Sequence, residues 1–294
     1  MVSRVEITVG PSERRARLED LLCARFPALS KMYLREVVKN GACEVNGRHE
    51  NIGKRLLPDD FIEIEVDLGR EHSMLPQDLP IDIVFEDGDI LVIDKPAGML
   101  VHPSHREKNG TLLNAVVHHL NRELKGAFVR PGLVHRLDKG TSGLIVIAKN
   151  PRAHRILCSH FQRKLIEKRY TALVDGSVDE ASGTIEGAIG RNADAKQWQL
   201  SPDGKRGETR FWVKERFAGT TLLELEPVTG RTNQLRIHCE SIGHPIVGDT
   251  ARGGSEHRRL CLHASSLTLI HPTTGERCKF TSAADLQFSH SQAI

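Results

Sequence analysis

The chain carries at residues 131–150 the sequence PGLVHRLDKGTSGLIVIAKN, which contains a single aspartate, Asp138. Residues 139–143 (KGTSG) predict a turn, because glycine reaches positive φ and Thr and Ser hydroxyls bond the nearby backbone. Residues 144–148 (LIVIA) are apolar and rich in β-branched side chains, which predicts a short buried strand. The stretch therefore places a carboxylate in front of a turn that leads into a buried strand.

Cations flank this carboxylate in the sequence. Arg136 stands two residues before Asp138, and Lys139 directly follows it. Nearby positive charge favours the ionised form of a carboxylate. The local composition fits a poised reactive group and a structural ion pair equally well, because ion-pair networks also perturb pKa values.

Composition and charge limit the class of protein only loosely. The 294 residues include 41 Lys and Arg against 38 Asp and Glu, so the formal net charge is +3. This mild excess is compatible with nucleic acid but is weak evidence for it. No apolar run approaches the roughly 20 residues that cross a bilayer. The six cysteines form no C-x-x-C pair and no secretory signal is visible, so we expect a cytoplasmic protein with reduced thiols and no metal site.

The first part of the chain predicts a small module over residues 12–70. Residues 17–26 place apolar side chains at helical spacing, and Ser30 is a suitable N-cap for a second helix over residues 32–40. Short strands are predicted at residues 43–46 and 61–66. Prolines and charges without periodicity predict a linker at residues 71–80.

The remaining residues, 81–294, predict a second and larger domain. Two apolar runs joined by Asp87-Gly88 predict a hairpin. Helices are predicted at residues 111–124 and 152–163 and after a turn at residue 230, and strands at residues 168–174, 211–213, 221–225 and from 262. Strands outnumber helices and short turns join them, so we expect an α+β protein whose larger domain has a mixed, mainly antiparallel sheet with flanking helices.

Other catalytic motifs find no support. The chain contains no G-x-S-x-G, no G-x-x-x-x-G-K-[ST] and no G-x-G-x-x-G, so nothing indicates a nucleotide cofactor. Residues 141–143 and 249–251 faintly resemble the Asp-Thr loops of aspartic proteases. Two residues separate Asp138 from Thr141, however, which would point the carboxylate elsewhere.

The N-terminal module contains a specific order of short motifs. They are Arg17-Leu18-(x2)-Leu21-Leu22, Leu29-Ser30-Lys31, Asn40-Gly41, Val45-Asn46-Gly47 and Pro58-Asp59-Asp60. This order resembles an S4 RNA-binding domain, with Lys where that family more often has Arg in the second motif. The resemblance implies RNA binding by shape and phosphate, with Arg17, Lys31 and Arg35 among the contacts. An ordinary solvated helix face is the alternative that periodicity leaves open.

Five further motifs follow in the larger domain. They are VIDKPAGMLVHP from Val92, HRLDxxTSG from His135, KxY from Lys168, GRTxQLRxH from Gly230 and GHPIxGD from Gly243. Together they closely resemble the RluA-type pseudouridine synthases. The resemblance implies an isomerase, an intramolecular transferase that cuts uracil from its ribose in RNA, turns it and rejoins it through carbon. Both bonds belong to one nucleotide, so no redox partner or cofactor is expected.

The same resemblance implies roles for individual residues. Asp138 would be the essential carboxylate, either as nucleophile or as base, with Arg236 as its guanidinium partner. Tyr170 would stack on the target base, whereas a lone strand tyrosine is more often packed in a core. The base must leave its stack to be processed. The residues implied to contact RNA in this domain are Arg136, Lys139, Lys168 and Arg231.

We therefore expect an RNA pseudouridine synthase that acts as a monomer on structured RNA. Large-subunit ribosomal RNA is the leading substrate and tRNA the second. Asn233 stands where the family often has His, and the loop at residues 250–254 lacks a Tyr that the family often has. These two departures are the only features that favour the alternative, a catalytically inactive RNA-binding or ribosome-assembly factor.

Overall fold

The computed structural model describes residues 2–27, 29–69, 75–104, 106–122, 129–192 and 197–284. The chain divides into two compact units. The smaller contains residues 1–77, 103–109 and 117–130, and the larger contains residues 78–102, 110–116 and 131–294. Of the expected linker, residues 71–74 lie outside the described ranges.

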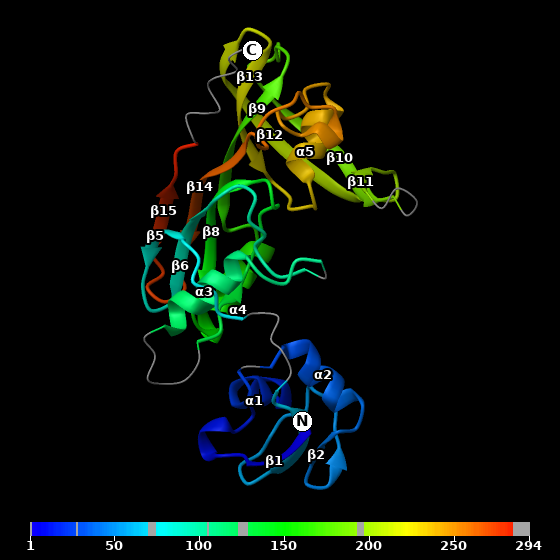
Figure 1. Cartoon of the computed structure of the whole chain (residues 1–294), viewed down its shortest axis with the longest axis vertical. Helices are drawn as coiled ribbons and strands as arrows, with labels where there is room; N and C mark the ends of the chain where they lie inside the picture. The colour runs from blue at the N-terminus through cyan, green and yellow to red at the C-terminus, as the bar shows by residue number, and fades with distance from the viewer. Residues whose placement is uncertain are drawn as a thin grey trace. The chain divides into compact units, whose positions relative to one another are not determined.

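The described part of the smaller unit contains a four-stranded antiparallel sheet with helices beside it (Figure 1). The strand order is β1 (Val2–Thr8), β4 (Phe61–Asp67), β2 (Cys43–Val45) and β3 (Arg48–His49). The 3-10 turn η1 (Pro11–Glu13) precedes α1 (Leu18–Arg25) and α2 (Lys31–Lys39). The two expected helices and strands are confirmed, and the Ser30 hydroxyl accepts the Tyr33 N–H at 3.1 Å as an N-cap.

Strand β1 is an element that the sequence reasoning missed. It pairs antiparallel with β4 along its whole length, from Val2 opposite Asp67 to Thr8 opposite Phe61. Ile7 and Val9 are buried in the core that the two helices cover. The alternation of Val5, Ile7 and Val9 with polar residues is the period-2 signal that predicts such a strand.

The larger unit is built on a single sheet, which has 11 strands among the described residues. Its order is β11-β10-β12-β13-β9-β14-β8-β6-β5, with β15 added to β14 and β7 to β8. Among the described strands, β8 and β14 form the only parallel pair. The expected α+β fold with a mixed, mainly antiparallel sheet is therefore confirmed. The strands are β5 (Asp82–Glu86), β6 (Ile90–Lys95), β7 (Gly132–Leu133), β8 (Ser142–Ala148), β9 (Glu167–Asp175), β10 (Ser182–Arg191), β11 (Trp198–Leu200), β12 (Lys205–Phe217), β13 (Thr220–Pro227), β14 (Leu262–Ile270) and β15 (Arg277–Thr281).

Helices flank this sheet at two places (Figure 1). Helix α4 (Pro151–Gln162) packs against β7 and β8, and the Asn150 side chain caps it by accepting the Ala153 N–H. Helix α5 (Gln234–Ser241) packs against β10 to β13 and is followed by the 3-10 turn η2 (Thr250–Arg252). The helix expected at residues 111–124 is α3 (Leu112–Asn121), and residues 123–124 lie outside the described ranges.

Strand β8 begins earlier than the sequence indicates. Ser142 and Gly143 belong to it, so the turn is confined to the residues before Thr141, and every residue of β8 is buried. Gly143 has φ 107°, and a Cβ there would overlap the Ala264 carbonyl oxygen and lie 2.5 Å from the Ala264 nitrogen. Only glycine therefore allows β8 to approach β14 at this point.

The sheet order explains how distant segments come together. Asp138 lies just before the turn that leads into β8, Tyr170 lies on β9, and β14 alone separates these two strands. Strand β13 lies on the other side of β9, and the chain that leaves it, residues 228–233, starts α5. Tyr170 thus lies on the sheet, and Asp138 and Arg236 lie on segments that adjoin neighbouring strands of it.

Candidate active site

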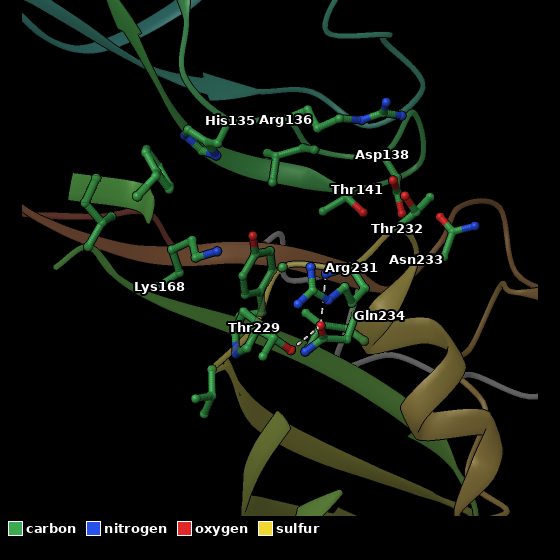
Figure 2. Close-up of a pocket in the computed structure, with 18 of the residues that line it drawn as sticks. His135, Arg136, Asp138, Thr141, Lys168, Thr229, Arg231, Thr232, Asn233 and Gln234 are labelled. Atoms are coloured by element: carbon green, nitrogen blue, oxygen red, sulfur yellow. Dashed lines mark hydrogen bonds between the residues drawn. The ribbon is translucent and has the colours of Figure 1, made fainter. Parts of the chain in front are cut away.

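A cavity of about 580 Å³ opens in the larger unit where these segments meet (Figure 2). Its lining comes from residues 134–138 before β8, from the end of α4, from the first half of β9 and from residues 227–236. Asp138, Tyr170 and Arg236 all line it. The structure therefore brings the three predicted catalytic residues into one cavity.

Asp138 is held in the turn before β8. Its backbone carbonyl accepts the Thr141 N–H at 3.1 Å, and its side chain is 25% exposed. The Oδ2 of Asp138 lies 4.0 Å from the Nη1 of Arg236. The carboxylate faces a guanidinium at ion-pair range but without a close hydrogen bond to it.

The pKa of Asp138 is raised above its ordinary value. Burial is the largest cause, and the negative charge of Asp249 acts in the same direction. Arg236, Arg136 and Lys95 oppose this rise but do not cancel it. Positive neighbours alone would have lowered the pKa, as the sequence suggested. The sign differs because desolvation disfavours the charged form of a carboxyl group.

Arg236 in the first turn of α5 is bound mainly by another carboxylate. Its Nε donates to the Oδ2 of Asp249 and its Nη2 to the Oδ1, both at 2.6 Å. Asp249 is buried, with 3% of its surface exposed. The sequence reasoning quoted Asp249 as the end of the last motif but assigned it no role, and that motif was the available signal.

Tyr170 is buried in β9 and lines the cavity. Burial, together with the charge of Asp138, raises the pKa of its phenol above the ordinary value. The hydroxyl therefore stays protonated at neutral pH, so Tyr170 offers an aromatic surface and a hydrogen-bond donor.

The loop between β13 and α5 is fixed by Gln234, a residue that sequence reasoning quoted but left without a role. Its Oε1 accepts the Thr229 hydroxyl at 2.6 Å and the Arg231 N–H at 3.0 Å, as the dashed lines of Figure 2 show. Its Nε2 donates to the Glu208 carbonyl at 2.9 Å and to the Thr209 hydroxyl at 3.0 Å. Both ends of this buried amide are used, so the loop has one position against β12.

Asn233 starts α5 in the left-handed region, with φ 56°. Asparagine tolerates this region better than most residues. Its Oδ1 accepts from the Nη1 of Arg236 at 3.5 Å. The departure from the more usual His therefore leaves the guanidinium in place at the rim of the cavity.

The wall formed by the end of α4 and the start of β9 is apolar and aromatic, and it also contains Lys164 and Lys168. His135 stacks on Phe161 with ring centroids 4.7 Å apart, and its Nε2 accepts the Val146 N–H at 3.1 Å. Burial lowers the pKa of His135 to about 3, so this ring is neutral. The Nζ of Lys168 lies 5.8 Å from the centre of the Phe161 ring, and burial lowers the pKa of this ammonium. Figure 2 shows Lys168 on this side, opposite Asp138 and Asn233.

The remaining predicted RNA contacts in this unit are exposed. Arg136 lines the cavity, and Figure 2 shows its side chain extending on the side of Asp138. Arg231 also lines the cavity, and its Nε donates to the Arg206 carbonyl at 3.1 Å. Lys139 does not line it, and its backbone carbonyl accepts from the fully buried Lys95 at 3.4 Å.

In the smaller unit, one carboxylate collects two of the predicted cations. The Nζ of Lys31 lies 3.0 Å from the Oε2 of Glu19, and the Nε of Arg35 donates to the Oε1 of the same residue. Both cations remain about half exposed. Arg17 directly precedes α1, and its backbone bridges to Arg55.

The described residues contain neither a metal-binding cluster nor a membrane-spanning helix. No group of three or more His, Cys, Asp or Glu side chains there could hold a metal ion. No helix in the same ranges is long and apolar enough to cross a membrane.

Comparison with known proteins shows the same relationship over most of the chain. The family described as RNA pseudouridylate synthase matches residues 89–241. An uncharacterized RNA pseudouridine synthase of Bacillus subtilis is 36% identical over 285 residues, which cover 95% of this chain and 94% of the relative. Ribosomal large subunit pseudouridine synthase D of Pseudomonas aeruginosa is 37% identical over 289 residues, 90% of this chain and 88% of the relative.

A solved structure supports the same fold. Human RNA pseudouridylate synthase domain containing 1 superposes with a TM-score of 0.59 at 29% identity, and the match covers 70% of this chain and 84% of the human one. The chain therefore belongs to the RluA-type family of RNA pseudouridine synthases, enzymes that isomerise uridine in RNA.

Proposed function

We propose that this enzyme converts specific uridines of large-subunit ribosomal RNA to pseudouridine, with Asp138 as the essential carboxylate, Arg236 as its partner and Tyr170 beside the base. The observation that carries the proposal is the convergence of these three residues in one cavity. The substrate class rests on likeness to ribosomal large subunit pseudouridine synthase D, at 37% identity in one relative and 35% in another.

Pseudouridine formation changes bonds within a single nucleotide. The N1–C1′ bond of uridine breaks, a C5–C1′ bond forms, the proton on C5 leaves, and N1 takes up a proton. Asp138 attacks the ribose or the base as a nucleophile, or removes a proton as a base. A carboxylate whose pKa is raised by burial is the stronger base and nucleophile once ionised, and Asp138 has such a pKa. Tyr170 holds the flipped base by stacking and hydrogen bonding.

RNA is held around the cavity by cations at different depths. Arg136 and Arg231 lie at its exposed edge and meet phosphates, as Lys139 does nearby. Lys168 lies deeper, and within the described part of the chain its ammonium has no hydrogen-bond acceptor, only the Phe161 ring. A desolvated ammonium without an acceptor is suited to an uracil carbonyl or a phosphate oxygen.

Replacing Lys168 with Met should weaken RNA binding about tenfold or more, because the bound RNA loses a hydrogen bond to a charged group. Filter binding of labelled RNA measures this change. Lys214, an exposed lysine of β12 that does not line the cavity, provides the control as Lys214→Met. Equal affinities of the two variants would contradict a contact between Lys168 and RNA.

The smaller unit fits a separate role in RNA binding. We assign residues 12–70 to an S4-like module and residues 81–294 to the catalytic domain. The small antiparallel sheet is consistent with an S4-like fold. Glu19 holds Lys31 and Arg35 side by side while leaving both partly exposed, which suits contact with successive phosphates.

The substrate assignment is tested by mapping. Ribosomal RNA and tRNA are extracted from cells that lack the enzyme, treated with the purified protein and reacted with carbodiimide, which marks pseudouridine. We expect new sites in the large-subunit ribosomal RNA and none in tRNA. New sites only in tRNA would show a tRNA-specific synthase, and no new site in any RNA would favour the inactive assembly factor.

A further inference from the structure

Arg236, which lines the cavity, is bound by a buried residue to which no role has been assigned. Both carboxylate oxygens of Asp249 accept hydrogen bonds from Arg236, each at 2.6 Å. Such paired bonds between a guanidinium and a carboxylate fix direction as well as distance. Asp249 is only 3% exposed, so little water competes for the pair.

Backbone hydrogen bonds and close packing fix the loop that carries Asp249. The Asp249 N–H donates to the Ile246 carbonyl at 2.9 Å, and the Asp249 carbonyl accepts the Gly254 N–H at 3.0 Å. Gly248 has φ 82°, and a Cβ there would overlap the Arg259 carbonyl oxygen. Any side chain at residue 248 would therefore force this part of the loop to move.

The same loop is tied to the strand that carries Tyr170. Ile246 forms a β-bridge with Val174 of β9, and the Val247 N–H donates to the Leu173 carbonyl at 2.9 Å. Asp249 therefore has a fixed position relative to β9. Through its two bonds, the Arg236 guanidinium has one too.

Because Asp249 occupies two nitrogen atoms of the Arg236 guanidinium, fewer donors remain for Asp138. Its Nε and Nη2 are used by Asp249, and only Nη1 faces Asp138, at 4.0 Å. A guanidinium free of Asp249 could turn its fork to Asp138 and form a close bidentate pair. Such a pair would bind the carboxylate oxygens that the reaction needs.

We propose that Asp249 is a positioning residue that holds Arg236 beside Asp138 and prevents the guanidinium from closing on it. This role rests on the proposed function of Asp138 and Arg236. The charged and titratable groups that face Asp138 are Arg136 from its own loop, Lys95 from the end of β6, Tyr170 from β9, Arg236 from α5 and Asp249 from the loop after α5.

The test compares wild type with Asp249→Asn, Arg236→Gln and the double variant. Total RNA labelled with [5-³H]uridine, from cells that lack the enzyme, serves as the probe, and tritium release reports loss of the C5 proton. Asp249→Asn should lower the single-turnover rate about 10- to 100-fold, as expected when a reacting group is misplaced. RNA affinity should stay within about twofold, because the lost contact holds a reacting group and not the RNA.

The pH profile separates this role from a structural one. Loss of the negative charge of Asp249 lowers the pKa of Asp138 directly and also leaves the positive charge of Arg236 uncompensated, so the acid limb of the rate should move to lower pH. In the Arg236→Gln background, Asp249→Asn should have little further effect on the rate at pH values above the acid limb, because the positioning effect of Asp249 is exerted through Arg236. Glu256→Gln removes a negative charge from an exposed position after the same loop, and it should behave as wild type.

Two results for the Asp249 variants would contradict the proposed role of Asp249. A wild-type rate and acid limb in Asp249→Asn, or additive losses in the double variant, would show that Asp249 does not act through Arg236. If Asp249→Asn does not fold, Arg236→Lys is the alternative test. We expect Asp249 to bind the single ammonium of the lysine, so that less positive charge faces Asp138. The pKa of Asp138 then rises, and the acid limb of the rate moves to higher pH. A move to lower pH would contradict the proposal. Wild-type tritium release only from tRNA would overturn the ribosomal RNA assignment but leave this comparison intact.

Discussion

Asp138→Asn should abolish pseudouridine formation while RNA binding persists. The substitution keeps the size of the side chain but removes the only carboxylate that lines the cavity within the described residues. Loss of a general base lowers a rate by about 10² to 10⁴, and loss of a nucleophile by on the order of 10⁶. Tritium release under single-turnover conditions measures the rate, so the size of the loss also indicates which role Asp138 has.

Binding and folding supply the controls for this variant. The amide removes a partly buried charge, so Asp138→Asn should fold normally and bind RNA within about twofold of wild type, because a reacting group contributes to rate more than to affinity. Asp203→Asn, at an exposed turn position outside the cavity, should retain full activity. Activity of Asp138→Asn within about tenfold of wild type would exclude Asp138 as the essential carboxylate.

Gly143→Ala should destabilise the larger unit by roughly 3–5 kcal/mol, a size reserved for severe steric and backbone conflicts. The backbone has φ 107°, which costs an L side chain, and the added Cβ would overlap the Ala264 backbone. Strands β8 and β14 would have to separate to relieve the overlap. The midpoint of urea unfolding, followed by tryptophan fluorescence, measures the change, since the two tryptophans of the chain, Trp198 and Trp212, both belong to this unit.

Gly98 offers a matched control for the steric part of this effect. It also has positive φ, 84°, but a Cβ there would meet nothing within 4 Å. Gly98→Ala should therefore cost only the backbone strain, about 1–2 kcal/mol. Equal losses in the two variants would show that strain alone, and not the contact with Ala264, makes Gly143 necessary.

Sequence patterns predicted the elements whose signal is local. The apolar run of β8 and the helical spacing of α1, α2 and α4 are confirmed. Strand β10 was missed because its glycines, including Gly183, weaken a strand pattern. The reason for Gly183 is tertiary: a Cβ there would lie 2.7 Å from the Phe211 ring on the neighbouring strand.

Sequence motifs predicted which residues form the candidate site, but they did not predict all of the ion pairs that these residues form. Asp138, Tyr170 and Arg236 were found through motifs, and they do line one cavity. The bond between Arg236 and Asp249 was not foreseen, because residues of suitable charge are frequent and spacing alone does not select a partner. The four hydrogen bonds of Gln234 were missed for the same reason.

The sequence by itself determined the local elements around Asp138 and, through the order of its motifs, the family. Only the tertiary structure decided the state of that carboxylate. Flanking cations in the chain indicate a lowered pKa, whereas burial of the carboxyl group in the folded domain raises it. Desolvation depends on all the segments that cover a group, and these segments come together only in the folded sheet.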